Sequence, residues 1–424
     1  MMEPRATCSK ALVLDFFAEA VFLLGQEAST RTVQVTLGDL VGQGASAVVH
    51  AVNSFVKVGS GYKHEADGEA DDHLLVAKIF RLEKGTGVQP VELAIHEARI
   101  LAAARGHPSI VCSYGLFRAK SGVSQDLLGT FARKVRPRAC QSRRVLPGDV
   151  DDLPMHFLVM ERCECSLRDL KGLRDFTEPE AAVAVAAVLR ALAHLHRLRI
   201  VHRDVKHANV MVADGGNRVV LADLELAAEI PPDDATIDWP CGTLGFMAPE
   251  VHAFQKGSSA SDIFSLGVLL YLLVTGFHPF LEDTLSETCE ATLRRQIPTR
   301  PAGVLANTSQ ACVCLLEDLL DRDLLRRITA EEALMHPWMC LEEHGSLCRF
   351  VEEFVSCAGH VQTDTSAACA EEPSTRPPKA TPRERSIWKL WRSMISVAST
   401  TASRVMGSNP LGRAKTQDFD PVHP

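Results

Sequence analysis

The stretch that decides the fold is IVHRDVKHANVMV, residues 200–212. It places an aspartate, a lysine and an asparagine close together, at Asp204, Lys206 and Asn209. A carboxylate can accept a proton from a hydroxyl group, an ammonium group can steady a moving phosphoryl group, and a carboxamide oxygen can hold a metal ion. The alternative is that His202 is a core histidine beside a structural ion pair. The catalytic interpretation therefore needs support from other parts of the chain.

A second acidic stretch follows at residues 219–230, VVLADLELAAEI. Asp223 is a candidate metal ligand here, alongside Asn209. Leu224 is apolar and can pack beneath a neighbouring helix. Glu225 adds a second carboxylate two positions after the first.

A glycine-containing stretch lies upstream at residues 41–52, VGQGASAVVHAV. Gly42 and Gly44 would let the backbone turn tightly over a phosphate, and Val49 would cap a purine ring. Taken alone, the stretch is better explained as an ordinary β-turn, because glycines are common in hairpins.

A lysine and a glutamate follow at a suitable interval. LLVAKIF, residues 74–80, places Ala77 and Lys78 on a predicted strand, and HEARIL, residues 96–101, places Glu97 on a predicted helix. A lysine held by such a glutamate can contact the α- and β-phosphates of a nucleotide.

In this order the motifs resemble those of eukaryotic protein kinases, over about residues 35–340. The match continues with GTLGFMAPE at 242–250, SDIFSLGVLL at 261–270 and RRITAEEALMHPW at 326–338. Jointly these motifs are highly specific. Lys206 and Thr243 resemble the Ser/Thr kinases rather than the tyrosine kinases.

The resemblance implies a two-lobed α+β fold, with a small β-rich N-lobe up to about residue 160 and a larger helical C-lobe after it. It implies ATP and magnesium as cofactors and protein hydroxyl groups as substrates. The catalytic residues would be Asp204, Lys206 and Asn209, and the metal ligands Asn209 and Asp223. ATP would be bound by Val41, Gly42, Gly44, Val49, Ala77, Lys78, Glu97, Glu161 and Cys163. Two further roles are implied, a gatekeeper at Met160 and an ion pair between Arg327 and Glu250.

Glu225 departs from the family pattern, which has glycine at this position, and the usual third glycine of the upstream loop is Ala47. We expect an active Ser/Thr kinase, in which a glutamate fits this position if its backbone stays at negative φ and its carboxylate faces solvent. The other arrangement is a second carboxylate near the metal ion, where Glu225 is recruited as a metal ligand. The alternative is a pseudokinase scaffold that binds nucleotide or partners without turnover. A lipid or small-molecule kinase is a third interpretation, which the APE and HPW motifs argue against.

Arg203, next to the catalytic aspartate, normally needs a negative partner in the family. A phosphate on Thr236 would supply that charge, and we predict this residue as the activation switch. The carboxylates of Asp233, Asp234 and Asp238 are the alternative partners.

Composition excludes some classes of function. The net charge of −8 does not suggest a nucleic-acid partner, and thirteen cysteines without a CxxC pair indicate reduced thiols. We therefore expect a cytoplasmic or nuclear protein.

Three units are predicted along the chain. Residues 1–34 form a helical extension with an amphipathic helix over 11–24, residues 35–340 form the kinase domain, and residues 341–424 form a tail. The tail combines a linker with a basic amphipathic helix near 385–405, which suits calmodulin, a membrane surface or docking on its own kinase domain. Simple packing on the large lobe is the alternative. The small lobe also contains two charged insertions, an acidic loop at 64–73 and a basic loop at 133–144.

Overall fold

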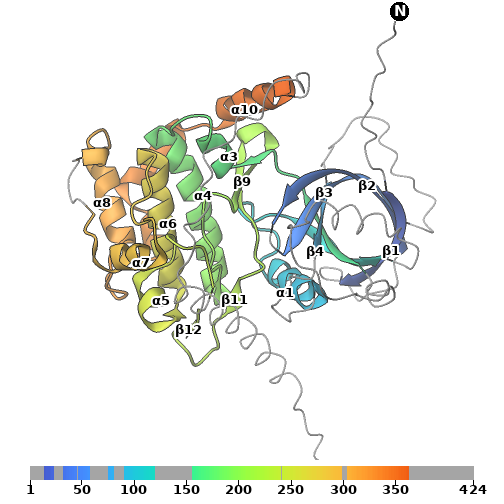
Figure 1. Cartoon of the computed structure of the whole chain (residues 1–424), viewed down its shortest axis with the longest axis horizontal. Coiled ribbons are helices and arrows are strands. Elements are labelled where there is room, and N and C mark those ends of the chain that lie inside the picture. The colour runs from blue at the N-terminus through green and yellow to red at the C-terminus, as the bar shows by residue number, and fades with distance from the viewer. Residues whose placement is uncertain are drawn as a thin grey trace, which may run out of the picture.

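A computed structural model describes residues 14–22, 32–44, 46–57, 75–80, 90–119, 155–239, 241–297 and 303–361. These residues form a β-rich N-lobe and a helical C-lobe (Figure 1), so the predicted two-lobed α+β fold is confirmed. The predicted acidic loop, basic loop and tail helix lie outside the described residues. No helix among the described residues is long and apolar enough to cross a membrane.

The N-lobe is a closed antiparallel barrel with the strand order β1-β2-β3-β4-β6-β5. Its strands are β1 (Leu14–Phe22), β2 (Thr32–Gln43), β3 (Ala47–Lys57), β4 (Leu75–Phe80), β5 (Ser113–Ala119) and β6 (His156–Glu161). Buried side chains such as Val35, Phe117 and Phe157 fill the barrel. One helix, α1 (Pro90–Ala103), packs against β5 and β6 and lies on the side of the barrel that faces the C-lobe (Figure 1).

The helix expected over residues 11–24 was wrong, because this region contains strand β1. Asp15 and Glu19 interrupt the apolar run at a spacing of four, and residues four apart share a face in a helix and in a strand alike. The pairing of β1 with both β2 and β5 decides for the strand, and it closes the barrel. Ala18 of this strand is fully buried in the barrel core.

The C-lobe is built around two buried helices, α4 (Glu178–Arg197) and α6 (Ser259–Thr275). Helix α4 begins at a capping box, in which Thr177 accepts from the backbone N–H of Glu180 and the Glu180 carboxylate accepts from Thr177. Its many alanines allow α6 and α9 to approach closely. This packing gives the catalytic loop a rigid base.

The remaining helices and strands of the C-lobe surround this pair. The helices are α3 (Leu167–Lys171), α5 (Pro249–Phe254), α7 (Leu285–Arg294), α8 (Gln310–Leu319), α9 (Ala330–Leu334), α10 (Cys348–Val361), η1 (Asp214–Gly216), η2 (Gly303–Leu305) and η3 (Pro337–His344). The short strands are β7 (Cys165–Ser166), β8 (Ile200–Val201), β9 (Val210–Ala213), β10 (Arg218–Leu221), β11 (Ala228–Glu229), β12 (Ile237–Asp238) and β13 (Lys256–Gly257).

The folded unit extends beyond the predicted boundaries of 35 and 340 at both ends. Strand β1 precedes the first boundary, and helix α10 follows the second. Phe350 of α10 is fully buried and lies under the guanidinium of Arg174. Both additions bury apolar side chains against the lobe that they join.

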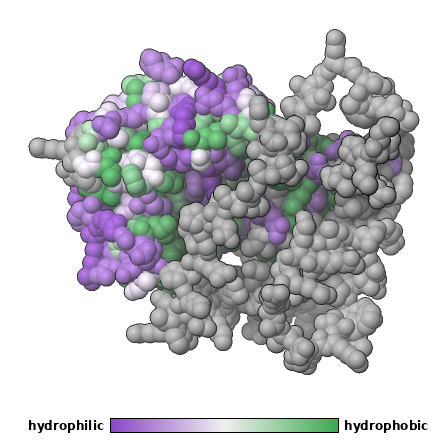
Figure 2. Space-filling view, turned by 45° about the horizontal axis from the view of Figure 1, so that its top comes forward, coloured by the Kyte–Doolittle hydropathy of each residue, from purple (hydrophilic) through white to green (hydrophobic). Residues whose placement is uncertain are grey.

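The face of the C-lobe that Figure 2 shows is largely hydrophilic, with hydrophobic areas interspersed. Among the described residues, highly exposed apolar side chains lie at or just beyond helix ends, at Phe254, Phe277 and Met335, and in the turn between α8 and α9, at Leu325.

Candidate active site

The catalytic loop forms a hydrogen-bonded network around Asp204. Its Oδ2 accepts from Lys206 Nζ at 2.6 Å and from Asn209 Nδ2 at 3.1 Å, and its Oδ1 accepts from Thr243 Oγ1 at 2.6 Å. Lys206 Nζ also donates to Thr243 Oγ1 at 2.8 Å. The structure therefore brings together the three residues predicted as catalytic, and it adds Thr243 as a fourth member.

A buried aspartate supports this network from below. Asp262, at the start of α6, accepts from the backbone N–H groups of His202 and Arg203, each at 2.9 Å. Its Oδ2 also lies 2.9 Å from His196 Nε2. The backbone of Arg203 adopts a positive φ of 68°, which residues other than glycine rarely adopt. The contacts with Asp262 hold it in this conformation. The motif SDIFSLGVLL did not by itself predict this role for Asp262.

On the other side of the cleft, Lys78 on β4 is surrounded by carboxylates. Its Nζ lies 2.7 Å from Glu97 Oε2 and 2.7 Å from Asp223 Oδ1. Burial alone would lower the pKa of Lys78, but the three carboxylates Asp223, Glu97 and Glu225 raise it above its usual value. Burial raises the pKa of Glu97 to about 7 despite the attraction of Lys78. The predicted lysine–glutamate pair is formed.

Glu225 is the third carboxylate, and the prediction that it faces solvent was wrong. Its side chain is only 13% exposed, and its Oε2 accepts from Ser46 Oγ at 2.6 Å and lies 3.6 Å from Lys78 Nζ. Leu224 is fully buried, which anchors the segment and leaves the next side chain to point at the lysine. The φ of Glu225 is not positive, as predicted. The positive φ of 62° is at Asp223.

Ser46 was missed by sequence analysis. It lies between β2 and β3, 179 positions from Glu225. No local pattern in the sequence could indicate that contact.

Residues predicted to contact the nucleotide lie on or between neighbouring strands of the N-lobe barrel. Val49 on β3 pairs with Gly42 and with Lys78 across the sheet, and Ala77 is fully buried on β4. Gly44 donates from its backbone N–H to the carbonyl of Ala47 at 2.9 Å, which closes the turn. Val41 is exposed at the entrance to this turn.

Glu161 and Cys163 lie at the connection between the lobes. The Glu161 carboxylate accepts from the backbone N–H of Cys112 at 2.6 Å and forms an ion pair with Arg218. Because its carboxylate already bonds to Cys112 and Arg218, Glu161 would contribute to base binding through its backbone. Met160, the predicted gatekeeper, is buried on β6. The ion pair with Arg218 was not predicted.

The donor atoms fit the implied magnesium ions. The side chain of Asp223 is about half exposed to the cleft, at 45%. Asn209 uses its Nδ2 to donate to Asp204, so its Oδ1 is the atom that would bind a metal ion. Oxygen ligands of this kind suit magnesium.

The predicted ion pair between Glu250 and Arg327 is confirmed. Arg327 Nη1 and Nη2 donate to the two carboxylate oxygens at 2.8 and 3.0 Å. Both residues are buried, and Ser261 Oγ donates to Glu250 at 2.6 Å.

Arg203 contacts backbone carbonyls, and not the carboxylates that were the alternative to a phosphate on Thr236. Its guanidinium donates to the carbonyls of Leu226 and Asp238. The Asp238 carboxylate pairs instead with Lys256 at 2.7 Å. A second arginine, Arg199, donates to three further carbonyls of the same segment. Backbone carbonyls thus hold residues 226–238 against the catalytic loop.

Comparison with known proteins identifies the family of this chain. The family model of the protein kinase domain matches residues 57–339. The death-associated protein kinase of Caenorhabditis elegans is 37% identical over 163 residues, which cover 38% of this chain and 11% of that protein. The calcium/calmodulin-dependent protein kinase type II alpha chain of Drosophila melanogaster is 29% identical over 216 residues, 50% of this chain and 41% of that protein. Ribosomal protein S6 kinase alpha-6 of Mus musculus is 33% identical over 174 residues, 40% of this chain and 23% of that protein. The chain thus spans less than half the length of each of these relatives.

Proposed function

Because the chain belongs to the protein kinase domain family, we propose that it transfers the γ-phosphate of ATP to serine or threonine hydroxyl groups of proteins. The observation that carries the proposal is the network of Asp204, Lys206, Asn209 and Thr243, which is complete. Catalysis of phosphoryl transfer is mostly positioning and charge stabilisation, so all of these groups must be present together.

Each residue has a role that its contacts support. Asp204 accepts the proton of the substrate hydroxyl, and Lys206, already 2.6 Å from that carboxylate, neutralises charge on the transferred group. Lys78, held by Glu97, contacts the nucleotide phosphates. Asn209 and Asp223 would hold magnesium ions, which supply positive charge to the phosphates when bound.

The pseudokinase alternative finds no support in this geometry. The lysine, the catalytic aspartate, the metal asparagine and the metal aspartate are all present. Lys78 donates to Asp223, and Asn209 donates to Asp204. Glu225 and Ala47 depart from the family pattern, but neither replaces one of these four residues, and the backbone of Glu225 adopts no positive φ that would strain it.

Radiolabelled ATP gives a direct test of the enzyme. Purified protein should phosphorylate itself or a generic protein substrate, and phosphoamino-acid analysis should find phosphoserine or phosphothreonine. Asp204→Asn is the control, since the substitution keeps the size of the side chain and removes its basicity. Nucleotide binding without any transfer by the wild type would support the scaffold instead.

We also propose that residues 385–405 bind either calmodulin or an anionic membrane, and that the protein resides in the cytoplasm or nucleus. The support is the amphipathic sequence, in which Trp391 and Ile395 share a face with Ile387. A relative of this chain is named for its dependence on calcium and calmodulin. Titrating a peptide of this segment against calcium-loaded calmodulin and against vesicles with anionic lipid separates the two partners. Absence of binding to both would reject the proposal.

A further inference from the structure

The carboxylate of Glu225 joins the two elements that a nucleotide's phosphates would contact. One oxygen, Oε2, accepts from Ser46 Oγ at 2.6 Å and lies 3.6 Å from Lys78 Nζ. Ser46 belongs to the glycine-containing turn between β2 and β3, and Lys78 is the lysine of β4. A single anionic oxygen thus lies between the turn and the lysine.

We propose that the Glu225 carboxylate stands in for a nucleotide phosphate, and that Mg·ATP binds by displacing it from Ser46 and Lys78. The inference rests on the proposed function, in which Lys78 and the glycine-containing turn hold the ATP phosphates. Two anions cannot share one ammonium group without mutual repulsion, so the carboxylate competes with the incoming phosphate. The glycine of other family members has no side chain that could compete.

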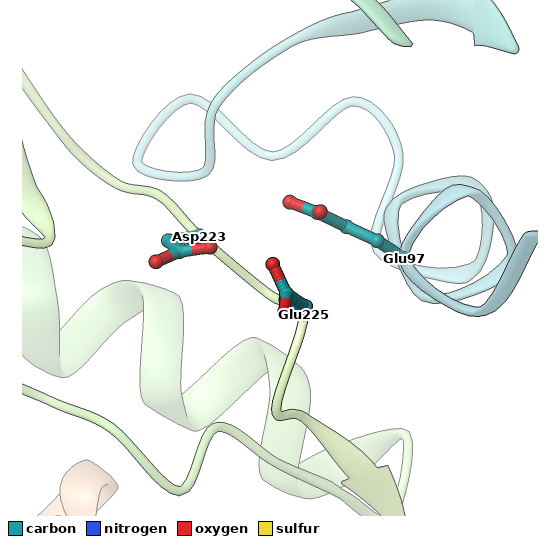
Figure 3. Close-up of side chains that lie close together, drawn as sticks. All are labelled: Glu97, Asp223 and Glu225. Atoms are coloured by element: carbon teal, nitrogen blue, oxygen red, sulfur yellow. The ribbon is translucent and has the colours of Figure 1, made fainter. Parts of the chain in front are cut away.

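The alternative is that these carboxylates bind a structural metal ion. Carboxylate oxygens of Glu97, Asp223 and Glu225 lie within 4.8 Å of one another (Figure 3). The Lys78 ammonium already lies 2.7 Å from two of these carboxylates and 3.6 Å from the third. The cation among the three is therefore the lysine itself, which would repel a metal ion placed there.

The burial of Glu225 makes the competition measurable. At 13% exposure the carboxylate is poorly screened by water and salt, unlike a surface glutamate. Replacing it with glutamine keeps an acceptor for Ser46 and removes the charge that attracts Lys78. Glu229 is a matched control, because it lies on β11 four positions away, is 60% exposed and carries the same charge.

The test measures dissociation constants of Mg·ATP and adenosine by isothermal titration calorimetry, at one magnesium concentration. We expect Glu225→Gln to bind Mg·ATP about tenfold more tightly than the wild type, or about 1.4 kcal/mol. Adenosine has no phosphate, so its affinity should stay unchanged. Glu229→Gln should match the wild type for both ligands.

A second variant tests the contact with the turn. Ser46→Ala should bind Mg·ATP about threefold more tightly, on the scale of one modest hydrogen bond. The double variant with Glu225→Gln should gain less than the product of the two single effects, because both changes release the same carboxylate.

The outcomes separate the inference from the proposed function. Weaker Mg·ATP binding by Glu225→Gln would overturn the inference and make the carboxylate a ligand for the metal or nucleotide. Equal binding by wild type and Glu225→Gln would overturn it while leaving the proposed function intact. Absence of Mg·ATP binding by every folded variant and by the wild type would overturn both.

Discussion

The buried ion pair between Arg327 and Glu250 gives the sharpest prediction about stability. The Arg327 side chain is 0% exposed, and besides the carboxylate it donates to the carbonyls of Ala260 and Asp321 at 2.8 and 2.7 Å. Arg327→Ala leaves a buried carboxylate without its counter-ion. Breaking a buried pair from one side costs about 3–5 kcal/mol. We expect the lower end of this range, because Ser261 still donates to Glu250.

Differential scanning fluorimetry measures the effect as a change in melting temperature. A loss of about 3 kcal/mol corresponds to a fall of about 6–10 °C in a domain of this size. Arg326→Ala is the matched control, because its neighbouring guanidinium is 77% exposed and lies 3.5 Å from Asp321. Such surface pairs contribute about 0–1 kcal/mol. Melting of both variants within about 2 °C of the wild type would contradict this cost for the buried pair.

Three further predictions concern activity and pH. Asp204→Asn should lower phosphoryl transfer at least about 100-fold and leave the ATP dissociation constant nearly unchanged, because the residue acts on the hydroxyl proton; wild-type turnover in a radiolabel assay would contradict its role. Thr236→Ala should lower kinase activity and Thr236→Glu should restore it, because a phosphate on this residue would give Arg203 a negative partner; full activity in Thr236→Ala would mean that the backbone carbonyls of Leu226 and Asp238 are enough to hold Arg203. Burial, with a smaller effect of a neighbouring histidine, lowers the pKa of His278 to about 4, against 6.5 for an ordinary histidine. The unfolded chain therefore binds more protons between these values, so stability should fall as the pH drops from about 6.5 to about 4. Urea unfolding across this window should show a weaker pH dependence in His278→Asn.

Much of the candidate site was predictable from short motifs. Asp204, Lys206 and Asn209 lie on one loop, so their spacing in the sequence already determines that they can meet. The pairing of Lys78 with Glu97 was also predictable, because a strand lysine and a helix glutamate at this interval recur in one family of folds. The alanine-rich apolar period of residues 178–198 also predicts a long buried helix, and α4 occupies this stretch.

Other features depended on contacts that local patterns do not encode. The run at residues 14–22 has acidic residues four apart, which is compatible with a helix and with a strand. It forms a strand because it pairs with the edges of both β2 and β5. Arg203 found carbonyl partners because the backbone of residues 226–238 folds back onto the catalytic loop.

Glu225 shows both what the sequence determines and what only the tertiary structure determines. The sequence by itself determined that a carboxylate stands where the family has glycine, and that Asp223 is retained. Only the tertiary structure decided where that carboxylate points, because its partners, Ser46 and Lys78, belong to the other lobe. A side chain turns toward the charge and hydrogen-bond donors that surround it, and those come from strands far away in the chain.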